Sequence, residues 1–592
     1  MSSSRTRLLA SLLNESNIIK PSLAPASLEA GNVTTYSSID SLPLTGNTNG
    51  DQALITSTNT LYIFSNGWYK IALINSTPYW STEAASSYDL STTGASTVIT
   101  ILATDSEGVP ITYTATTDSD FNQIATVTKD SDNGRTFTII PTDSENGLAV
   151  AGSGIITFKA SDGVNLVSTL STFSITFDPN WANPTGTKLA VSNLSAADRY
   201  GFSVAISGDG NYAIVGSERE DTGGGDRGGA YIYLRSGSSW SEQALIQASD
   251  AANGDYFGTS VSISTNGTYA IAGAYGVGTF VGAAYVFTRS GSTWTQQAKL
   301  TASDAQTSDY FGELVAISGD GNYAIVGAQY EDGGSGDPAL DAGAVYVYVR
   351  SGSSWSEQAI LRASDAEASD RFGNSIEINS DGSYIIVGAR LEDTTFSGAG
   401  SAYIFTRSGS TWTQQAKIQA SNAGDGDGFG YSVAISGDGN YAISGAFFED
   451  TGGSNTGSAY IFSRSGSTWT QQQQIQSTNV NDNDRFGTCV SMNSDGTYVV
   501  VGAGDAHIDS DGINNIVDTG QGYIFKRDGS TWSQVGVLTA PDAQAYDNLG
   551  GTSRAASISD DGAYAILGAW NEDGGAGDPL SNAGAAYIFE AG

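Results

Sequence analysis

The chain is short of the residues that most catalytic and metal sites use. Its 592 residues include a single cysteine, Cys489, and a single histidine, His507. One cysteine excludes a disulfide bond within the chain. So few thiols and imidazoles also exclude a thiolate zinc site and a histidine-based hydrolase. We therefore expect a protein that is not an enzyme.

Basic residues and long apolar runs are scarce as well. The chain has 25 Lys and Arg against 62 Asp and Glu, a net charge of −37. Nucleic acid binding requires a surplus of Lys and Arg, so we expect no nucleic acid partner. No run reaches the roughly 18 apolar residues of a transmembrane helix, so we expect no membrane insertion. The opening segment MSSSRTRLLASLLNESNIIK has only a short apolar run and reads as a poor signal peptide.

Glycine and β-forming residues are abundant. There are 74 glycines, and aromatic residues make up 10% of the chain. This composition predicts an all-β fold with many tight turns. The acidic surplus keeps such a protein soluble, and it can hold Ca²⁺ where carboxylates converge.

One sequence pattern is repeated seven times in the C-terminal two thirds of the chain. Each copy begins at an aromatic or leucine residue followed by glycine: Tyr200-Gly201, Phe257-Gly258, Phe311-Gly312, Phe372-Gly373, Phe429-Gly430, Phe486-Gly487 and Leu549-Gly550. We number the units 1 to 7 and call their four strand-like runs A to D. In unit 5 these are GYSVAIS, NYAISGA, GSAYIFSR and STWTQQQQIQ, and Gly437-Asp438-Gly439 joins A to B. A four-stranded sheet cannot bury both faces alone, but seven sheets stacked around an axis can, which predicts a seven-bladed β-propeller.

The ends of the repeat region predict a closed ring. Unit 7 lacks a tryptophan-containing strand D, and an orphan segment of that kind, NWANPTGTKLAVS, precedes unit 1. Its Trp181 aligns with Trp240, Trp294, Trp355, Trp412, Trp469 and Trp532. We expect this segment to pair with the last blade, so the predicted propeller domain spans 179–592.

The repeated pattern resembles a known family. FG…SVAIS…YAIVGA, together with TRSGSTWTQQAKL at Thr288–Leu300, is similar to FG-GAP repeats, the blade motif of integrin-α-like propellers. The resemblance implies a seven-bladed propeller used for adhesion or recognition. The short A–B turns depart from the calcium-binding members of that family, because each turn offers one carboxylate or at most two, whereas Ca²⁺ takes six to eight oxygens. We therefore expect no cofactor in those turns and keep Ca²⁺ as the one candidate cofactor elsewhere.

The N-terminal third predicts three further parts. Residues 1–27 are expected to be an anchoring segment and 28–85 a small β module, in which NTLYIFSNGWYKI reads as a hairpin around Asn66-Gly67. The stretch 28–81 resembles small β units of structural proteins of marine tailed phages. Residues 86–178 resemble an Ig- or cadherin-like β-sandwich. Asp105, Glu107 and Asp162 lie at turns where cadherin-like modules can hold calcium, although turn formation is the favoured interpretation.

Two sets of acidic residues recur in the units. An aspartate stands two residues before each FG step: Asp198, Asp255, Asp309, Asp370, Asp427, Asp484 and Asp547. Because it is present in every unit, we interpret it as a cap of the D–A turn that accepts backbone N–H groups. The B–C loops carry five acidic pairs: Glu220-Asp221, Glu331-Asp332, Glu392-Asp393, Glu449-Asp450 and Glu572-Asp573.

The five acidic pairs predict an acidic rim, since B–C and D–A loops share one face of a propeller. Such a rim is suited to cations, a basic partner or hydrated glycans, and the alternative is a merely solvated rim. Paired carboxyls also serve glycoside hydrolysis, but five similar pairs argue against one specialised pair.

Binding candidates are the places where the repeat breaks. Unit 2 replaces the acidic pair with YGVGTFVG, which is expected to expose Tyr275 and Phe280. Unit 6 has the longest B–C insertion, with Asp505, His507, Asp509 and Asp511. The spacing of the last two is faintly like a calcium loop, but no well-placed glutamate follows.

Two hypotheses about function follow. In the first, the chain is a non-enzymatic virion structural protein, a phage tail fibre or capsid appendage. Its N-terminal segment would bind other virion proteins, and its propeller would bind a host-cell receptor or glycan. Such a protein is expected to be a symmetric homo-oligomer. In the second, it is a secreted or cell-surface bacterial adhesin that depends on calcium.

Overall fold

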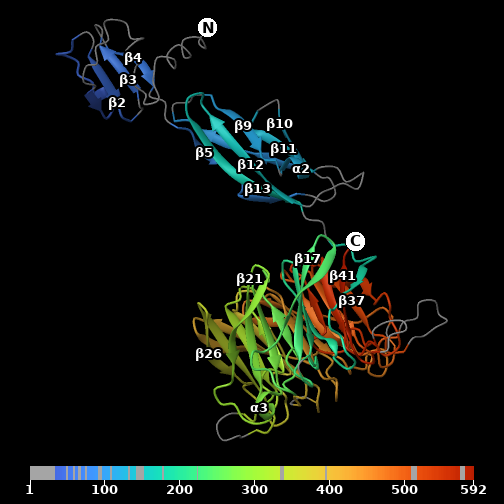
Figure 1. Ribbon diagram of the computed structural model, residues 1–592. Coiled ribbons are helices and arrows are strands. Elements are labelled where there is room, and N and C mark those ends of the chain that lie inside the picture. Colours follow the sequence, from blue (N-terminus) through green and yellow to red (C-terminus); the bar gives the residue numbers. More distant parts are fainter. Residues whose placement is uncertain are drawn as a thin grey trace. The chain divides into compact units, whose positions relative to one another are not determined.

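The computed structural model divides the chain into two compact units, Met1–Asp178 and Pro179–Gly592 (Figure 1). It describes residues 34–592 except for 49–50, 58–59, 65–67, 74–76, 91–95, 107–109, 120, 131–133, 142–151, 176–178, 223, 334–338, 394–395, 480, 508–516 and 574–579. The predicted anchoring segment 1–27 lies outside the described residues. Both units are built almost wholly from strands, as the composition predicts.

The first unit begins with a four-stranded sheet in the order β1-β2-β3-β4. Its strands are β1 (Thr34–Tyr36), β2 (Gln52–Ile55), β3 (Thr60–Phe64) and β4 (Trp68–Leu73), with the 3₁₀ helix η1 (Ile39–Ser41) between the first two. The antiparallel pair β3–β4 is the predicted hairpin, although its turn at Asn66-Gly67 lies outside the described residues.

A β-sandwich follows in the same unit. One sheet has the order β6-β13-β12-β9, a second β10-β11-β7, and a third the pair β5-β8. The strands are β5 (Tyr79–Thr82), β6 (Ser87–Asp89), β7 (Thr97–Thr100), β8 (Leu102–Thr104), β9 (Thr112–Thr117), β10 (Ala125–Lys129), β11 (Thr136–Pro141), β12 (Gly152–Ser161) and β13 (Leu166–Ile175), with the short helix α2 (Phe121–Ile124). Phe137, Phe158 and Phe173 meet in one core, so the sheets pack face to face.

The predicted boundary between residues 85 and 86 is wrong in position. Strand β5 pairs with β8 of the sandwich, and Ala84 and Trp80 pack into the sandwich core. Because these residues bury apolar surface there, the sandwich begins before Tyr79 rather than at residue 86. This limit could not be predicted, since the long-range pairing of β5 leaves no local pattern in the sequence.

The second unit consists of seven four-stranded sheets, each antiparallel and each in A-B-C-D order. Blade 1 is β15 (Tyr200–Ile206), β16 (Tyr212–Ser217), β17 (Gly229–Ser236) and β18 (Ser239–Ile246); blade 2 is β19 (Val261–Ile263), β20 (Tyr269–Ala274), β21 (Ala283–Ser290) and β22 (Thr293–Leu300), with α3 (Val277–Phe280) in its B–C loop; blade 3 is β23 (Leu314–Ile317), β24 (Tyr323–Ala328), β25 (Ala344–Ser351) and β26 (Ser354–Leu361). Blade 4 is β27 (Ser375–Ile378), β28 (Tyr384–Ala389), β29 (Ser401–Ser408) and β30 (Thr411–Ile418); blade 5 is β31 (Ser432–Ile435), β32 (Tyr441–Ala446), β33 (Ser458–Ser465) and β34 (Thr468–Ile475); blade 6 is β35 (Phe486–Met492), β36 (Tyr498–Ala503), β37 (Gln521–Asp528) and β38 (Thr531–Leu538).

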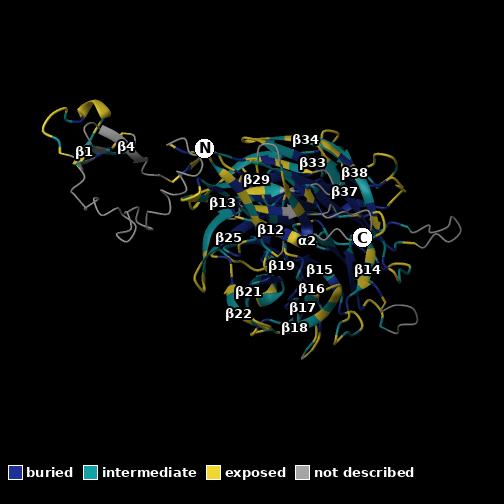
Figure 2. Ribbon diagram, turned by 90° about the horizontal axis from the view of Figure 1, so that it is seen from above, coloured by how far each residue is buried: buried dark blue, intermediate teal, exposed yellow. Residues whose placement is uncertain are grey.

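The last sheet takes strands from both ends of the unit. Blade 7 has the order β39 (Ala556–Ile558), β40 (Tyr564–Ala569), β41 (Ala585–Glu590) and then β14 (Thr185–Lys188). Strand β14 pairs antiparallel with β41, with Lys188 opposite Tyr587, and Trp181 donates from Nε1 to the Gly562 carbonyl at 3.0 Å. The inner strands touch in sequence from β15 to β39, and β39 touches β15. The sheets therefore form a closed seven-membered ring, around which they follow one another in Figure 2.

The hydrophobic cores lie between neighbouring blades. One core joins Val286 of blade 2 to Phe311 and Tyr346 of blade 3, and all three are almost fully buried. Strand D also ties blades together, since Trp355 donates to Gln297 of the preceding blade at 2.8 Å. A blade therefore buries its faces only by stacking on its neighbours.

The FG step is a contact between backbones. Gly312 has φ +87°, and a Cβ placed on it would lie 2.1 Å from the Ala283 carbonyl oxygen of the preceding blade. A Cβ on Gly273 of blade 2 would in turn lie 1.8 Å from the Gly312 carbonyl oxygen. Only glycine fits such an approach, and it also adopts positive φ freely. This explains why the two glycines recur in every unit.

Candidate functional site

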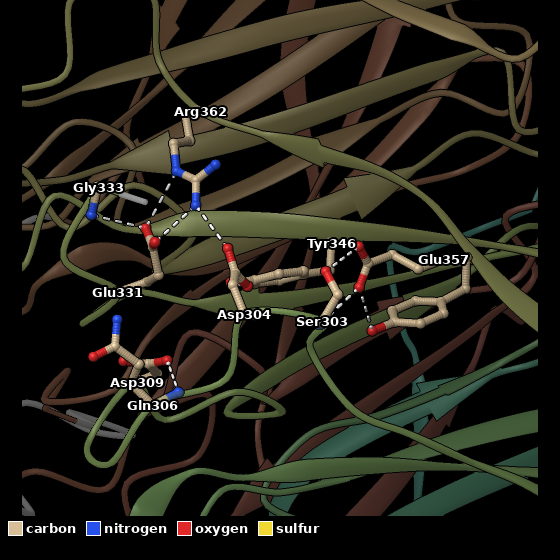
Figure 3. Close-up of polar contacts among 10 residues, drawn as sticks. Ser303, Asp304, Gln306, Asp309, Glu331, Gly333, Tyr346, Glu357 and Arg362 are labelled. Atoms are coloured by element: carbon tan, nitrogen blue, oxygen red, sulfur yellow. Dashed lines mark hydrogen bonds and ion pairs between the residues drawn. The ribbon is translucent and has the colours of Figure 1, made fainter. Parts of the chain in front are cut away.

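The seven aspartates before the FG steps cap the D–A loops, as predicted. The Asp309 carboxylate accepts the Gln306 backbone N–H at 2.7 Å, a contact that Figure 3 shows. The same bond, to the backbone N–H three residues earlier, is made by Asp198, Asp255, Asp370, Asp427, Asp484 and Asp547. Burial raises the pKa of Asp309 to about 6 and that of Asp198 to about 7. These carboxylates are buried structural groups.

The predicted acidic rim is wrong for its glutamates. Glu331 is 4% exposed and accepts a hydrogen bond from Arg362 at the end of strand D at 2.7 Å. Arg362 also pairs with Asp304 of the D–A loop at 3.2 Å. Figure 3 shows this network inside blade 3. A buried charge is tolerated only when it is paired and hydrogen-bonded, which explains the basic partner.

The other four glutamates are buried in the same way. Glu220, Glu392, Glu449 and Glu572 are at most 4% exposed. Their partners are Gln247 for Glu220, Lys417 for Glu392, Ser458 for Glu449 and Lys188 for Glu572. Only the aspartates of the pairs reach solvent: Asp221, Asp393, Asp450 and Asp573 are exposed, and Asp332 is half-buried. The pairs therefore join the B–C loop to the rest of the blade, and the rim is less acidic than predicted.

The two candidates of blade 2 belong to a row of aromatic rings. Tyr275 and Phe280 are half-buried rather than fully exposed as expected. Tyr275 stacks on Tyr256 of the preceding D–A loop, with ring centroids 5.0 Å apart, and lies 5.5 Å from Tyr310 of the next one. Tyr310 in turn lies 4.6 Å from Tyr330 of blade 3. The row therefore crosses from blade 2 to blade 3.

The row ends on an arginine. The Arg371 guanidinium of blade 4 lies over the Tyr330 ring at 3.8 Å and pairs with Asp341 at 3.2 Å. Tyr256, Tyr310 and Arg371 each stand directly before an FG step, where all have φ between 56° and 61°. Non-glycine residues rarely adopt this left-handed conformation.

The candidates of blade 6 are only partly described. Asp505 pairs with Arg485 at 2.7 Å and accepts a hydrogen bond from Asn548 at 3.0 Å. The His507 Nδ1 atom lies 2.9 Å from the Asp505 carbonyl oxygen. Asp509 and Asp511 lie outside the described residues. The structure thus brings Asp505 beside Arg485, which is another residue directly before an FG step.

These contacts form part of one surface, which we call the axial mouth. It comprises the side chains beside the inner strands at the end of the ring where the B–C and D–A loops lie: Arg199, Phe202, Arg219, Tyr256, Tyr275, Tyr310, Glu313, Tyr330, Arg371, Arg390, Tyr431, Phe447, Phe448, Arg485, Arg554 and Trp570. Arg554 connects its two sides, since it lies over the Phe202 ring at 5.7 Å and pairs with Glu313 of blade 3 at 3.2 Å.

A longer inner segment in blade 7 places Arg554 near the axis. From the FG step to the serine that opens the A–B turn, blade 7 runs Leu549–Ser559, three residues longer than Phe429–Ser436 of blade 5. The Ser553 carbonyl accepts from Ser432 of blade 5 at 3.3 Å, and Arg554 also contacts Thr259 of blade 2. Below it a cavity of about 180 Å³ is lined by the inner strands of all seven blades. The added residues therefore cover this cavity on the side of the mouth.

Twelve of the fourteen arginines of the propeller fall into two groups. Six of them end strand C and each stacks on a tyrosine of the neighbouring blade: Arg235, Arg289, Arg350, Arg407, Arg464 and Arg527. A second six belong to the axial mouth: Arg199, Arg219, Arg371, Arg390, Arg485 and Arg554. The mouth thus gathers positive charge and aromatic surface in a chain of net charge −37.

Sequence reasoning found part of this site. It singled out Tyr275 of the mouth, together with Phe280 and Asp505, which contact Tyr310 and Arg485 of the mouth, because the repeat breaks there. It missed Tyr256, Tyr310 and the six arginines. The available signal was the position directly before each FG step, which changes from unit to unit while its neighbours stay constant: Arg199, Tyr256, Tyr310, Arg371, Gly428, Arg485 and Asn548.

The acids of the turns that were weighed as calcium sites make other contacts where they are described. Asp209 in the first A–B turn accepts from Ser207 at 2.6 Å and from the Asn211 backbone N–H at 3.0 Å. Asp162 of the sandwich accepts the Val164 and Asn165 backbone N–H groups, each at 2.7 Å, so it is a turn-forming acid. Asp105 is buried, and Glu107 lies outside the described residues. In the part of the chain that the structure describes, no three His, Cys, Asp or Glu side chains are grouped to hold a metal ion.

No helix among the described residues is long and apolar enough to cross a membrane. The longest described helices have four residues, as in α2 and α3.

Comparison with known proteins bears on the propeller. The FG-GAP repeat family model matches seven segments: 186–233, 240–287, 294–348, 355–405, 412–462, 469–525 and 532–589. No curated protein sequence matches the chain.

Several solved structures are similar. Hydrazine synthase of Kuenenia stuttgartiensis has 12% identity and a TM-score of 0.41, covering 64% of this chain and 94% of that one. The WD40 repeats of RRP9 have 9% identity and a TM-score of 0.41, covering 70% and 98%. The β-propeller domain of the Trilobed protease from Pyrococcus furiosus has 10% identity and a TM-score of 0.33, covering 62% and 91%.

Proposed function

The chain belongs to the FG-GAP repeat family, and from this premise we propose that it is a non-enzymatic recognition protein whose propeller binds a cell-surface ligand through the axial mouth. FG-GAP propellers are typical of adhesion and recognition. The observation that carries the proposal is the gathering of aromatic rings and arginines at one end of the ring. Aromatic and arginine side chains are the types that dominate the energetics of binding surfaces.

The repeat itself supports the choice of this surface. Positions that hold blades together, such as the FG glycine and the capping aspartate, are the same in all seven units. The position directly before the FG step, in contrast, is arginine in three units, tyrosine in two, glycine in one (Gly428) and asparagine in one (Asn548). A ring that keeps its scaffold and varies one set of side chains presents an asymmetric surface, as recognition of one ligand requires.

We further propose that the protein is a virion component, a phage tail fibre or capsid appendage that attaches to the host. This finer assignment rests on the resemblance of residues 28–81 to small β units of tailed-phage structural proteins. In this arrangement the N-terminal segment binds other virion proteins, the sandwich acts as a spacer, and the propeller meets a host receptor or glycan. The protein would act as a symmetric homo-oligomer.

The second candidate is a bacterial secreted or cell-surface adhesin that depends on calcium. It is favoured by the same mouth and by the acidic insertion of blade 6, whose Asp509 and Asp511 are spaced like calcium ligands.

Binding of the full chain, and of 1–178 and 179–592 separately, to phage particles and to host cells tests these proposals. If the protein is a virion component, 1–178 binds particles and 179–592 binds cells. An adhesin shows no particle binding, and its cell binding falls when calcium is chelated. If the full chain binds host cells and residues 179–592 do not, recognition by the propeller is contradicted.

A further inference from the structure

The side of the axial mouth in blades 4 to 6 combines aromatic faces with guanidinium groups. Tyr431, Phe447 and Phe448 of blade 5 form a cluster, with centroids 4.0 Å apart for the first two rings and 3.9 Å for the last two. Arg390 lies over the Tyr431 ring at 5.9 Å, and Arg485 lies over the Phe448 ring at 5.4 Å. Blade 5 carries Gly428 where other blades place an arginine, a tyrosine or, in blade 7, an asparagine, so no side chain of its own stands before its FG step.

Three arginines affect the ionisation of the Tyr431 hydroxyl. Burial raises the pKa of Tyr431, and the positive charges of Arg390, Arg554 and Arg485 each oppose that rise. The three guanidinium groups therefore lie within electrostatic reach of the Tyr431 ring, although they come from blades 4, 7 and 6.

The ion pairs leave hydrogen-bond donors unused here. Arg485 uses Nη1 on Asp505, and Arg554 uses Nη2 on Glu313. The Nε atoms of both are buried and have no hydrogen-bond partner in the part of the chain that the structure describes. The Arg390 guanidinium has neither an ion pair nor a hydrogen bond within the described residues. Buried donors are almost always satisfied in folded proteins, so the two buried Nε atoms call for an acceptor that the described residues do not supply. The half-buried Arg390 guanidinium is open to an acceptor as well.

The charge balance of the mouth points to an anionic acceptor. Five of the six arginines of the mouth make ion pairs, and they share four carboxylates, those of Glu218, Glu313, Asp341 and Asp505. A guanidinium matches a carboxylate with two parallel hydrogen bonds. A polyanion would meet stronger repulsion from a chain of net charge −37 than a single carboxylate does.

The aromatic surface is the second feature of the mouth that selects its ligand. The apolar faces of sugar rings pack on aromatic side chains, and the row from Tyr256 to Tyr330 extends this surface across blades 2 and 3. We propose that the axial mouth binds a glycan carrying a carboxylate, with the carboxylate on Arg390 and Arg485 beside Tyr431 and neutral sugar units along the tyrosine row. This inference rests on the proposed function and names its ligand class.

Calorimetric titration of the full chain with an oligosaccharide that ends in a single glucuronate and with 3′-sialyllactose, each of which carries one carboxylate, tests the proposal. The matched neutral probes are the methyl ester of the first sugar and lactose. We expect binding of at least one acidic probe, affinity that falls as salt is raised, and at least tenfold weaker binding of its neutral counterpart. Arg390→Gln should weaken the acidic probe about tenfold or more without changing the melting temperature, since Arg390 holds no ion pair. Arg227→Gln, which removes an equal charge outside the mouth, should leave affinity unchanged.

Equal binding of acidic and neutral probes, equal loss in both variants, or no binding of either acidic probe would overturn the proposal. Cell binding by the propeller separates this failure from failure of the proposed function. If cells are bound but the glucuronate-terminated oligosaccharide and 3′-sialyllactose do not compete, the ligand class is wrong and recognition stands. If cells are not bound at all, recognition itself fails.

Discussion

At the scale of the residue, glycine is required where two blades meet through their backbones. Gly312 and Gly291 both have positive φ, +87° and +61°. A Cβ on Gly312 meets a carbonyl oxygen, whereas a Cβ on Gly291 meets nothing within 4 Å. Both positions therefore favour glycine for its backbone angle, but only Gly312 also excludes a side chain by steric contact.

We expect Gly312→Ala to lower the free energy of unfolding by roughly 3 kcal/mol or more, and Gly291→Ala by about 1 kcal/mol. The first change adds a clash that only a shift of the neighbouring blade relieves. Calorimetric melting of the two variants checks this. Equal melting temperatures would mean that the FG glycine is needed only for its backbone angle.

Glu377 is a second residue whose effect can be isolated. It lines the central cavity at a position where blades 1, 3 and 5 have Ala205, Ala316 and Ala434. Burial raises the pKa of Glu377 from 4.5 to about 7. The folded state therefore holds this proton more tightly than the unfolded chain does, and the contribution of Glu377 to stability is lost as pH rises through that window.

Glu377→Ala should accordingly stabilise the propeller at pH 8, by about 1–3 kcal/mol, and change it little at pH 4.5. Ser262→Ala, at the same position in blade 2, should show no such dependence on pH. Melting temperatures between pH 4 and 9 measure both. Destabilisation by Glu377→Ala at pH 8 would show that the carboxylate has a partner that stabilises its charged form.

The contacts of some residues could be predicted from the sequence, and those of others could not. The capping aspartates were predictable because a group present in all seven units serves the unit. The glutamates of the acidic pairs were placed wrongly because their partners, such as Arg362 for Glu331, lie a strand away. The axial mouth was mostly missed because Arg390, Arg485 and Arg554 come together only when the ring closes.

At the scale of the element, β14 completes blade 7 and brings Lys188 to a buried acid. Lys188 lies 2.8 Å from Glu572, whose side chain is 0% exposed, and 2.9 Å from Asp542. Lys299 occupies the matching place in blade 2, where the B–C loop has no glutamate, and it pairs only with Asp250, which is 50% exposed. Breaking a buried pair leaves an uncompensated charge, while an exposed pair contributes little.

Lys188→Met should therefore cost about 3–5 kcal/mol of stability, and Lys299→Met less than about 1 kcal/mol. The double change Lys188→Met with Glu572→Gln should recover much of the loss. Guanidinium unfolding followed by tryptophan fluorescence measures all three, because Trp181 precedes β14. Equal effects of the two single changes would show that β14 does not hold the ring closed.

The strand pattern of each blade was predictable because turn residues and alternating apolar residues are local signals. The pairing of β5 with β8 was not, because it joins segments without a turn between them. The fold of the propeller could thus be read from the repeat, whereas the limit of the sandwich could not.

At the scale of the whole molecule, the chain consists of two compact units with separate cores. Strand β14 belongs to the second unit, so a chain cut at 178/179 keeps every blade complete. We expect residues 179–592 to melt as in the full chain, in one cooperative transition. A chain that starts at Ser192 lacks β14 and should melt at a markedly lower temperature or aggregate. If both pieces melt alike, closure by β14 does not stabilise the ring.

The central claim is that the axial mouth, and not the outer rim, is the recognition surface. The most direct measurement is binding of labelled full chain to host cells by flow cytometry for two pairs of changes. Tyr310→Ala with Arg485→Gln alters the mouth, and Asp221→Asn with Asp393→Asn alters the exposed rim. We predict that the mouth variant loses at least tenfold in apparent affinity while the rim variant binds like the parent. Loss of binding in the rim variant with full binding in the mouth variant would contradict this account.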